Sequence, residues 1–258
     1  MRHVSNLKGV LRAYGDGNIF GEPYGEGTVR VAWLHGWCRR GRDFDECATI
    51  LAERGVASVS FDLPGFGASP LPTVAGGARL YAALMVEPLR ELAHDRLVLV
   101  GHSFGGRIAT VLAANQPELV AGVVLTGAPI LRNGPSKPPP PAYRILKALH
   151  RRGVVSDKRM EDARQRYGST DYKNASGLLR DVLVANVNES YEEELARITA
   201  PVAMVWGELD TEVPVAVAQR AQELIHAENS LRVVKAVGHL LPREAPMELV
   251  IEVEKLLG

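Results

Sequence analysis

The chain has few cysteines and no excess of charge of either sign. Cys38 and Cys47 are the two cysteines among 258 residues, too few for a disulfide framework or a four-cysteine zinc site, and we expect both to be buried, reduced thiols. Lys and Arg together number 30, as do Asp and Glu. This balance argues against a globally basic nucleic-acid-binding protein and against an acidic disordered chain.

Long hydrophobic runs are also missing. No stretch approaches the roughly 18 consecutive apolar residues of a membrane span, and the first residues, MRHVSNLKGVLRAYGDG, lack the apolar core of a secretory signal. We therefore expect a cytoplasmic protein with neither a membrane nor a nucleic-acid partner. A length of 258 residues suits one α/β domain with an insertion better than two full domains.

Short apolar segments recur along the chain at the spacing of an α/β domain. They are nearly continuous rather than alternating, which is typical of parallel strands covered on both faces, and most of the intervening segments are long enough for a helix. The predicted core strands are 29–34, 57–61, 97–100, 122–126, 202–206 and 231–235. The predicted helices are one capped by Asp43, one over 79–93, one from the residue after Ser103 to Asn115, and two over 215–227 and 246–257. Residues 10–14 and 18–23, joined by Gly15–Gly17, predict a hairpin before the first core strand.

The alternation is interrupted between Thr126 and Pro201. About seventy residues there contain helical patterns but no convincing core strand, beginning with the stiff, proline-rich stretch GPSKPPPP. We expect residues 1–129 and 201–258 to form the core domain and residues 130–200 to form a helical cap. From Arg132 to Arg166 there are ten Lys or Arg against three Asp or Glu, a net charge of +7 that leaves −7 on the remainder. A basic cap would favour an anionic substrate, and an ordinary solvated helix face is the alternative.

The clearest chemical signal is the segment GHSFGG, Gly101–Gly106. It follows a predicted strand and precedes a predicted helix, which is the setting of the G-x-S-x-G nucleophile elbow. Glycines beside the serine let the strand end and the helix start approach closely, so that the Ser103 hydroxyl projects above the sheet. A phosphate-binding loop is disfavoured because G-x-x-x-x-G-K and G-x-G-x-x-G are both absent.

A serine nucleophile needs a base, and the base needs an acid that orients it. Among seven histidines, His239 lies in a loop after the last predicted strand, at the carboxyl end of the sheet where ligands of open α/β folds bind. His239 is the candidate base, with a buried structural histidine as the alternative. Asp210 follows the strand 202–206 and is preferred to Glu208 as the orienting acid. The order Ser103, Asp210, His239 is that of nucleophile-elbow enzymes.

Two backbone N–H groups are candidates for stabilising an oxyanion, those of Trp37 and Phe104. Trp37 follows the first core strand in LHGW, where a glycine allows a turn, and Phe104 follows the nucleophile. The side chain of His35 is interpreted as structural. Arg107 could bind a substrate carboxylate, with a structural ion pair as the alternative. The apolar side chains expected to contact substrate are those of Trp37, Phe104, Trp206 and Tyr143.

The motifs LHGW, FDLPGFGAS, GHSFGG, WGELD and GH before LLP stand in this order along the chain. In this combination the sequence resembles the α/β-hydrolase superfamily, in its compact, capped, single-domain branch, over nearly the whole chain outside the insertion. The resemblance implies an eight-stranded, mostly parallel sheet with flanking helices and an inserted α-helical cap. It implies no cofactor and no metal, and it gives Asp62 a loop-organising role rather than a catalytic one.

The sequence therefore predicts a serine hydrolase that cleaves a small to medium carboxylic ester through an acyl-enzyme. A carbon–carbon bond hydrolase acting on a diketone or a ring-cleavage acid is one alternative, since it would use the same three residues. A non-catalytic ligand-binding receptor on a hydrolase scaffold is an alternative of another class. Dehalogenases and epoxide hydrolases are disfavoured because their nucleophile is an aspartate. The expected partner is a small-molecule substrate, and both a monomer and a homodimer are compatible with the sequence.

Overall fold

The computed structural model describes residues 9–132, 140–167, 172–173 and 175–258. These residues contain one eight-stranded sheet of order β1-β2-β4-β3-β5-β6-β7-β8. β1 and β2 pair antiparallel as a hairpin and β2 runs antiparallel to β4, whereas all other neighbours are parallel. The predicted fold class and edge hairpin are confirmed. The strands are β1 (Arg12–Tyr14), β2 (Ile19–Tyr24), β3 (Val29–Leu34), β4 (Ala57–Asp62), β5 (Leu97–His102), β6 (Val120–Thr126), β7 (Val202–Gly207) and β8 (Asn229–Val234).

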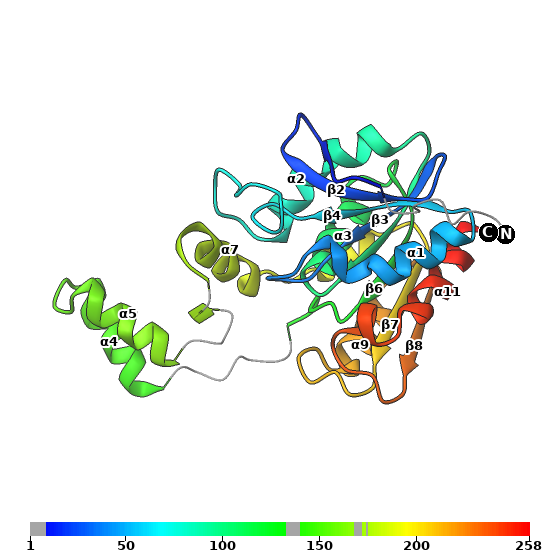
Figure 1. Ribbon diagram of the computed structural model, residues 1–258. Helices are drawn as coiled ribbons and strands as arrows, with labels where there is room; N and C mark the ends of the chain where they lie inside the picture. Colours follow the sequence, from blue (N-terminus) through cyan, green and yellow to red (C-terminus); the bar gives the residue numbers. More distant parts are fainter. Residues whose placement is uncertain (1–8, 133–139, 168–171, 174) are drawn as a thin grey trace.

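Helices cover both faces of the sheet (Figure 1). One face is covered by α1 (Asp45–Glu53) and α11 (Pro246–Leu257), and the other by α2 (Ala78–Leu92), α3 (Phe104–Asn115), α8 (Glu192–Arg197) and α9 (Val215–Leu224). Successive side chains of β5 enter different cores: Leu97 and Leu99 pack on the side of α2 and α3, and Val98 and Val100 on the side of α1 and α11. A strand buried on both faces needs apolar residues at every position, which explains its continuous apolar sequence.

Asp43 does not cap the helix that follows it. It lies in a short 3-10 helix, Gly41–Phe44, and α1 begins at Asp45 without a side-chain capping bond. Its carboxylate instead pairs with Arg39 and Arg243. The prediction of a cap was wrong because the guanidinium groups of Arg39, four residues earlier, and of Arg243, near the other end of the chain, occupy the oxygens that a cap would use.

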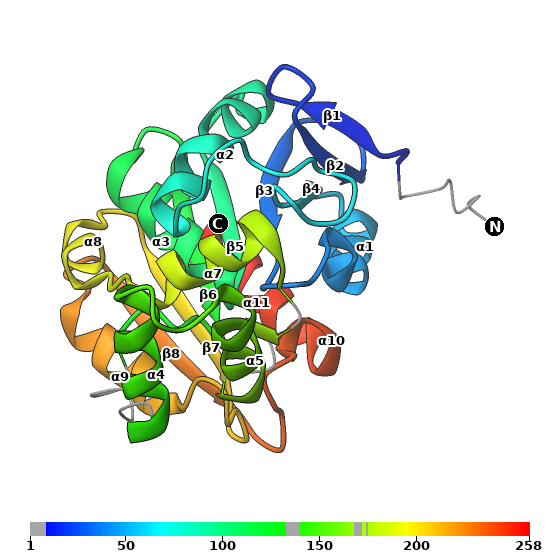
Figure 2. The ribbon, with the colours of Figure 1, turned by 90° about the vertical axis from the view of Figure 1, so that its left-hand side faces the viewer.

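Between β6 and β7 the regular elements among the described residues are all helical. They are α4 (Pro141–Arg151), α5 (Asp157–Tyr167), a helical fragment at 172–173, α7 (Gly177–Asn188) and α8. α4 and α5 pack against each other as a hairpin that lies apart from the sheet and its covering helices (Figure 1). In Figure 2, which is turned by 90° from Figure 1, α7 lies in front of β5 and β6. A Cβ at Gly65, in the loop after β4, would lie 3.0 Å from Leu179 of α7. α7 therefore covers the carboxyl edge of the sheet.

The two ends of the segment predicted as a cap are packed into the core domain. Ile130 and Leu131 at one end, and Leu195 and Ile198 at the other, are buried in the same hydrophobic cluster as the sheet. The part that stands outside the core is thus shorter than residues 130–200.

The cysteines differ in exposure. Cys47 is buried in α1, and burial raises the pKa of its thiol, whereas Cys38 is exposed and neither forms a disulfide. The expectation of two buried thiols was wrong for Cys38, which lies in the exposed turn after β3 and has a φ of 54°. No helix in the described ranges has the length and apolar character of a bilayer-spanning segment.

Candidate active site

Ser103 lies between β5 and α3 in a strained backbone conformation, with a φ of 51° and a ψ of −110°. Residues other than glycine rarely adopt a positive φ, and such strain is concentrated at functional sites. A Cβ at Gly105 would lie 1.9 Å from the carbonyl oxygen of Leu34, and one at Gly101 would lie 2.5 Å from that of Gly105. The elbow therefore requires both glycines of the G-x-S-x-G motif.

The loop after β3 packs directly against this elbow. The N–H of Gly105 donates to the carbonyl of His35 at 3.0 Å, and a Cβ at Gly36 would lie 3.3 Å from Cβ of Ser103. Phe104 is the first residue of α3, where an N–H has no intrahelical acceptor. The N–H of Trp37 donates to no other residue that the structure describes. Both N–H groups selected from the sequence thus flank the elbow, and neither has a backbone partner among the residues that the structure describes.

His35 and Asp62 organise the loops beneath this region. His35 Nδ1 donates to the carbonyl of Gly36 at 2.7 Å, and its Nε2 accepts from the N–H of Leu63 at 2.9 Å, so both ring nitrogens are used by a neutral ring. Burial lowers the pKa of His35 to about 4. The oxygens of Asp62 accept from the N–H groups of Gly41 and Ala68, both at 2.8 Å. These contacts fit the structural roles expected for both residues.

Asp210 and His239 meet beyond the carboxyl ends of β7 and β8. His239 Nδ1 lies 2.8 Å from Asp210 Oδ2, and Asp210 Oδ1 accepts from the N–H groups of Glu212 and Val213 at 3.0 and 2.8 Å. Because Nδ1 donates to Asp210, Nε2 of His239 is left as the acceptor nitrogen. Glu208, the alternative acid, is exposed and accepts from the N–H of Ala236 instead.

The pKa of His239 results from opposing effects. Burial lowers it, but the hydrogen bond and charge of Asp210, together with the charge of Glu212, outweigh burial and leave the pKa above its ordinary value of 6.5. A buried carboxylate partner favours the charged imidazolium. The pair is therefore arranged to take up a proton at Nε2.

Gly127 brings the histidine and the elbow together. Ser103 N–H donates to the carbonyl of Thr126 at 2.9 Å, and the next residue, Gly127, has a φ of 53° and packs against the His239 ring, since a Cβ there would lie 2.9 Å from Cε1. Within the described part of the chain, the Ser103 hydroxyl forms no hydrogen bond with His239, whose Nε2 lies 3.5 Å from Glu212 Oε2. The structure thus joins His239 to Asp210 by a hydrogen bond and places its ring against Gly127 and against His102, the residue before Ser103.

The four side chains predicted to contact substrate lie in different places. Trp37 and Phe104 form an edge-to-face pair with ring centroids 5.6 Å apart. Trp206 is fully buried, and its Nε1 donates to the carbonyl of Val213 at 2.7 Å, which supports the loop of Asp210. Tyr143 lies on α4 and meets Tyr167 edge to face, in the hairpin apart from the sheet.

Two aromatic residues beside the elbow were not predicted. Phe66 contacts Trp37 with ring centroids 5.2 Å apart, and Tyr81 of α2 contacts Phe104 at 4.9 Å. Phe66 stands in the quoted motif FDLPGFGAS, but no spacing connects it to Trp37, because the contact depends on how two loops pack.

Arg107 is engaged by the backbone. Its Nε donates to the carbonyl of Pro129 at 2.9 Å and its Nη1 to that of Asn186 at 2.8 Å, and the guanidinium lies over the ring of Tyr191. Burial lowers the pKa of Arg107. The side chain links α3 to α7, a structural role, although its partners are carbonyls rather than the ion pair considered from the sequence. Within the described ranges no group of His, Cys, Asp and Glu could hold a metal ion.

Comparison with known proteins gives a consistent picture. A model of the Alpha/beta hydrolase family matches residues 31–253. The uncharacterized hydrolase YugF of Bacillus subtilis is 25% identical over 261 residues, covering 91% of this chain and 92% of that protein. A 2-hydroxy-6-oxononadienedioate/2-hydroxy-6-oxononatrienedioate hydrolase of Cupriavidus pinatubonensis is 27% identical over 228 residues, 76% of this chain and 75% of that protein. The solved structure of Est816, an N-acyl homoserine lactone degrading enzyme, aligns with a TM-score of 0.70 at 26% identity, covering 94% and 98% of the two chains.

The buried histidines should make the fold sensitive to mild acid. The folded-state pKa of His35 is about 4 and that of His102 about 3. Below pH 6.5 these two histidines therefore become protonated in the unfolded chain while they stay neutral in the folded protein. The free energy of unfolding should fall as pH decreases through this range, by up to about 1.4 kcal/mol per pH unit for each histidine.

Urea unfolding at about pH 7 and about pH 5 checks this expectation. His35→Gln should lower stability at the higher pH but weaken the acid dependence, whereas His94→Gln, at an exposed position, should change neither. The same acid dependence in wild type and His35→Gln would show that His35 does not carry the effect.

Proposed function

Because the chain belongs to the alpha/beta hydrolase family, we propose that it is a serine hydrolase that cleaves small to medium carboxylic esters through an acyl-enzyme. The observation that carries this proposal is the placement of the strained Ser103 and the Asp210–His239 hydrogen bond at one edge of the sheet. A nucleophile, a base and the acid that orients the base form the minimal machinery for acyl transfer.

The first half of the reaction forms an ester between the enzyme and the acyl group. Ser103 Oγ attacks the carbonyl carbon of the substrate while His239 Nε2 accepts the hydroxyl proton. The carbonyl oxygen becomes an oxyanion held by the N–H groups of Trp37 and Phe104, and such donors contribute about 3 kcal/mol each to the stability of the transition state. The intermediate collapses, and the alkoxide leaves with the proton from His239.

The second half returns the enzyme to its starting state. His239 Nε2 takes a proton from a water molecule, whose oxygen attacks the acyl carbon. The new tetrahedral intermediate collapses, Ser103 regains its proton from His239, and the carboxylic acid is released. Asp210 keeps Nδ1 protonated throughout, because its second oxygen is fixed by two backbone N–H groups and cannot turn away.

The surroundings of the elbow support an ester with an apolar acyl group. Trp37, Phe104 and Phe66 form contiguous aromatic contacts beside Ser103, and aromatic walls with few polar groups are typical of small-molecule sites. A lactone is a cyclic ester, so the likeness to Est816 at 26% identity favours the same bond type.

Carbon–carbon bond hydrolysis is the second candidate. The similarity to the hydrolase from Cupriavidus pinatubonensis favours it, and the substrate named for that relative is a dicarboxylate. Arg107 is a poor choice for binding such a carboxylate because it already donates to two backbone carbonyls. The positive charge available to an anionic small molecule lies in the cap instead, in a groove of about 770 Å³ lined by Arg144, Lys147, Ala148, His150, Arg151 and Arg164.

Ser103→Ala should reduce hydrolysis of p-nitrophenyl esters to the uncatalysed background and abolish labelling by a fluorophosphonate probe, with thermal unfolding unchanged. Ser230→Ala, at an exposed position on β8, is the matched control and should behave as wild type. Labelling of Ser103 without hydrolysis of an ester of any acyl length would favour the carbon–carbon hydrolase. Absence of labelling would favour the non-catalytic receptor. Full activity in Ser103→Ala would contradict the proposed nucleophile.

Asp210→Asn should shift the acidic limb of kcat/KM to lower pH. The limb reports His239 in the free enzyme, and the substitution removes the hydrogen bond and charge that raise its pKa while burial, which lowers it, remains. Loss of the oriented tautomer should lower kcat by about 10⁴-fold. Glu212→Gln should give a smaller shift in the same direction, because its side chain is exposed. An unchanged acidic limb in Asp210→Asn would rule out this coupling.

If the basic groove attracts substrates, kcat/KM for a carboxylate-bearing ester should fall several-fold as salt increases, because screening weakens the attraction. A neutral ester of the same length should not respond. Replacing Arg144, Lys147 and Arg151 by Gln should remove the salt dependence for the charged ester. Equal salt responses of the two esters in the wild type would show that the groove does not act on the substrate.

A further inference from the structure

We propose that Glu244 is a positioning residue for His239, because its carboxylate holds the two peptide N–H groups on either side of that histidine. This inference rests on the proposed function, in which His239 is the base. Glu244 is the last residue of α10 (Leu241–Glu244). Its Oε2 accepts from the N–H of Gly238 at 2.7 Å and its Oε1 from the N–H of Leu240 at 3.0 Å.

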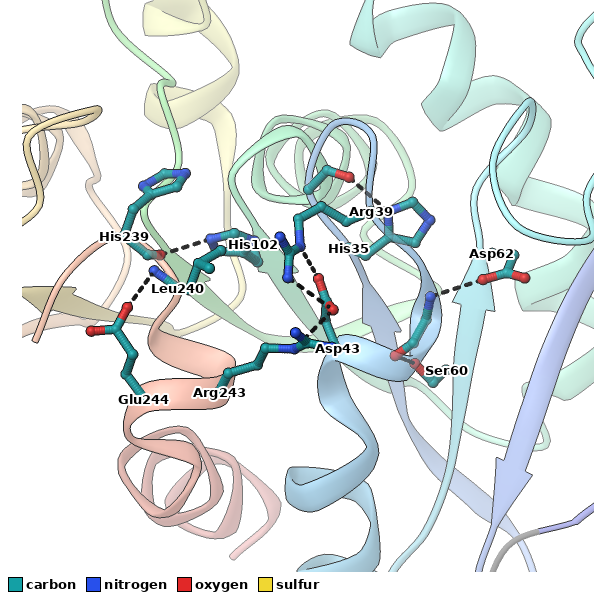
Figure 3. Close-up of polar contacts among 12 residues, drawn as sticks. His35, Arg39, Asp43, Ser60, Asp62, His102, His239, Leu240, Arg243 and Glu244 are labelled. Carbon is teal, nitrogen blue, oxygen red and sulfur yellow. Dashed lines mark hydrogen bonds and ion pairs between the residues drawn. The ribbon is translucent and has the colours of Figure 1, made fainter. Parts of the chain in front are cut away.

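Using both oxygens gives Glu244 a specific mechanical effect. One oxygen accepts from the N–H of the residue before His239 and the other from the N–H of the residue after it (Figure 3). The backbone of His239 is therefore restrained from both sides. Hydrogen bonds from N–H groups to a carboxylate are roughly twice as strong as those between neutral groups. A Cβ at Gly238 would lie 3.3 Å from both oxygens of Glu244, so glycine at this position leaves room for the close approach.

The carbonyl of His239 is held by a third hydrogen bond, from a residue next to the proposed nucleophile. His102 Nε2 donates to this carbonyl at 2.9 Å, and His102 immediately precedes Ser103. Burial lowers the pKa of His102 to about 3, so the ring is neutral and carries its proton on the nitrogen that faces the carbonyl. The backbone of the base is thereby connected to the elbow of the nucleophile.

The residue beside Glu244 extends the restraint to the loop after β3. Arg243 Nε lies 3.1 Å from Asp43 Oδ1, and Asp43 also pairs with Arg39, two residues after Trp37 (Figure 3). The carboxylate of Asp43 is largely buried between the two guanidinium groups. Consecutive residues of α10 therefore hold the histidine loop and, through Asp43, the loop that carries the Trp37 N–H.

Glu244 touches no group that would react, so its contribution should act through the orientation of His239. A displacement of about 1 Å in a catalytic group can cost about a hundredfold in rate. Such a loss falls on kcat rather than KM, because His239 accepts its proton only in the transition state. Glu244→Gln keeps one oxygen acceptor and should be intermediate, and Glu244→Leu keeps none.

The pH profile separates this role from a purely structural one. His239 is faced by Asp210 and Glu212 from the loop after β7, by Arg39 from the loop after β3 and by His102 from β5. A loosened backbone weakens the contact with Asp210 and so lowers the pKa of His239, moving the acidic limb of kcat/KM to lower pH. General destabilisation would not move that limb.

The experiment compares the full-length wild type, Glu244→Gln, Glu244→Leu and Glu254→Gln, the last removing an ion pair between Arg54 and Glu254 that is partly exposed. We expect Glu244→Gln to lower kcat for a p-nitrophenyl ester by about 10- to 100-fold with KM unchanged, with the acidic limb shifted to lower pH. Glu244→Leu should lower kcat further, and Glu254→Gln should have the kcat and pH profile of the wild type. If Glu244→Leu does not fold, Glu244→Gln decides the question.

A wild-type kcat and pH profile in Glu244→Gln would overturn the inference while leaving the proposed function intact. If the wild type hydrolyses no ester, the proposed function fails, and the low-field Nδ1–H resonance of His239 in proton NMR still decides the inference because it requires no turnover. Loss or displacement of that resonance in Glu244→Gln, but not in Glu254→Gln, supports positioning of His239. An identical resonance in both variants and the wild type contradicts it.

Discussion

The site depends on the positive φ of Ser103. That conformation exists only because β5 ends and α3 begins within contact of the loop after β3, a proximity that allows no side chain at Gly101 or Gly105. The same residues bind the neighbouring strands: Ser103 N–H donates to Thr126 and Gly105 N–H to His35. These bonds set the relative positions of the ends of β3, β5 and β6, where the N–H groups of Trp37 and Phe104 and the contact between Gly127 and His239 are found.

Three histidines lie near this edge, and their hydrogen-bond partners decide what each can do. All three experience burial that lowers the pKa. His35 and His102 face backbone groups, which satisfy a neutral ring, and their pKa values stay low. His239 faces the carboxylate of Asp210, which reverses the effect of burial. Burial alone therefore gives histidines with a low pKa, whereas one buried carboxylate raises the pKa of the third, which is the residue proposed as the base.

The sequence was sufficient where a local pattern determines the structure. Continuous apolar segments predicted the buried strands, and G-x-S-x-G between a strand and a helix predicted the elbow. The choice of Asp210 over Glu208 agrees with the observed partner of His239. Contacts outside these patterns were not predicted. Asp43 is held by Arg39, four residues earlier, and by Arg243 of α10 instead of capping α1, and Glu244 accepts from the N–H groups of Gly238 and Leu240. The Arg243–Asp43 pair depends on two loops that meet in space, which no spacing along the chain specifies, and the local contacts of Arg39 and Glu244 depend on the conformation of their own loops.

The segment between β6 and β7 has two parts, which differ in their contacts with the sheet and its covering helices. At the α7–α8 end, Tyr191 is buried between the guanidinium groups of Arg79 and Arg107, and its hydroxyl donates to Glu189 at 2.6 Å. Arg107 belongs to the helix that starts at the nucleophile, so this end is fixed to α3. The α4–α5 hairpin carries the basic groove and stands apart from the sheet. Because the elbow, the Asp210–His239 pair and the Glu244 restraint all lie in the core domain, sequence changes in the hairpin can alter which substrates are admitted without disturbing the groups proposed to react.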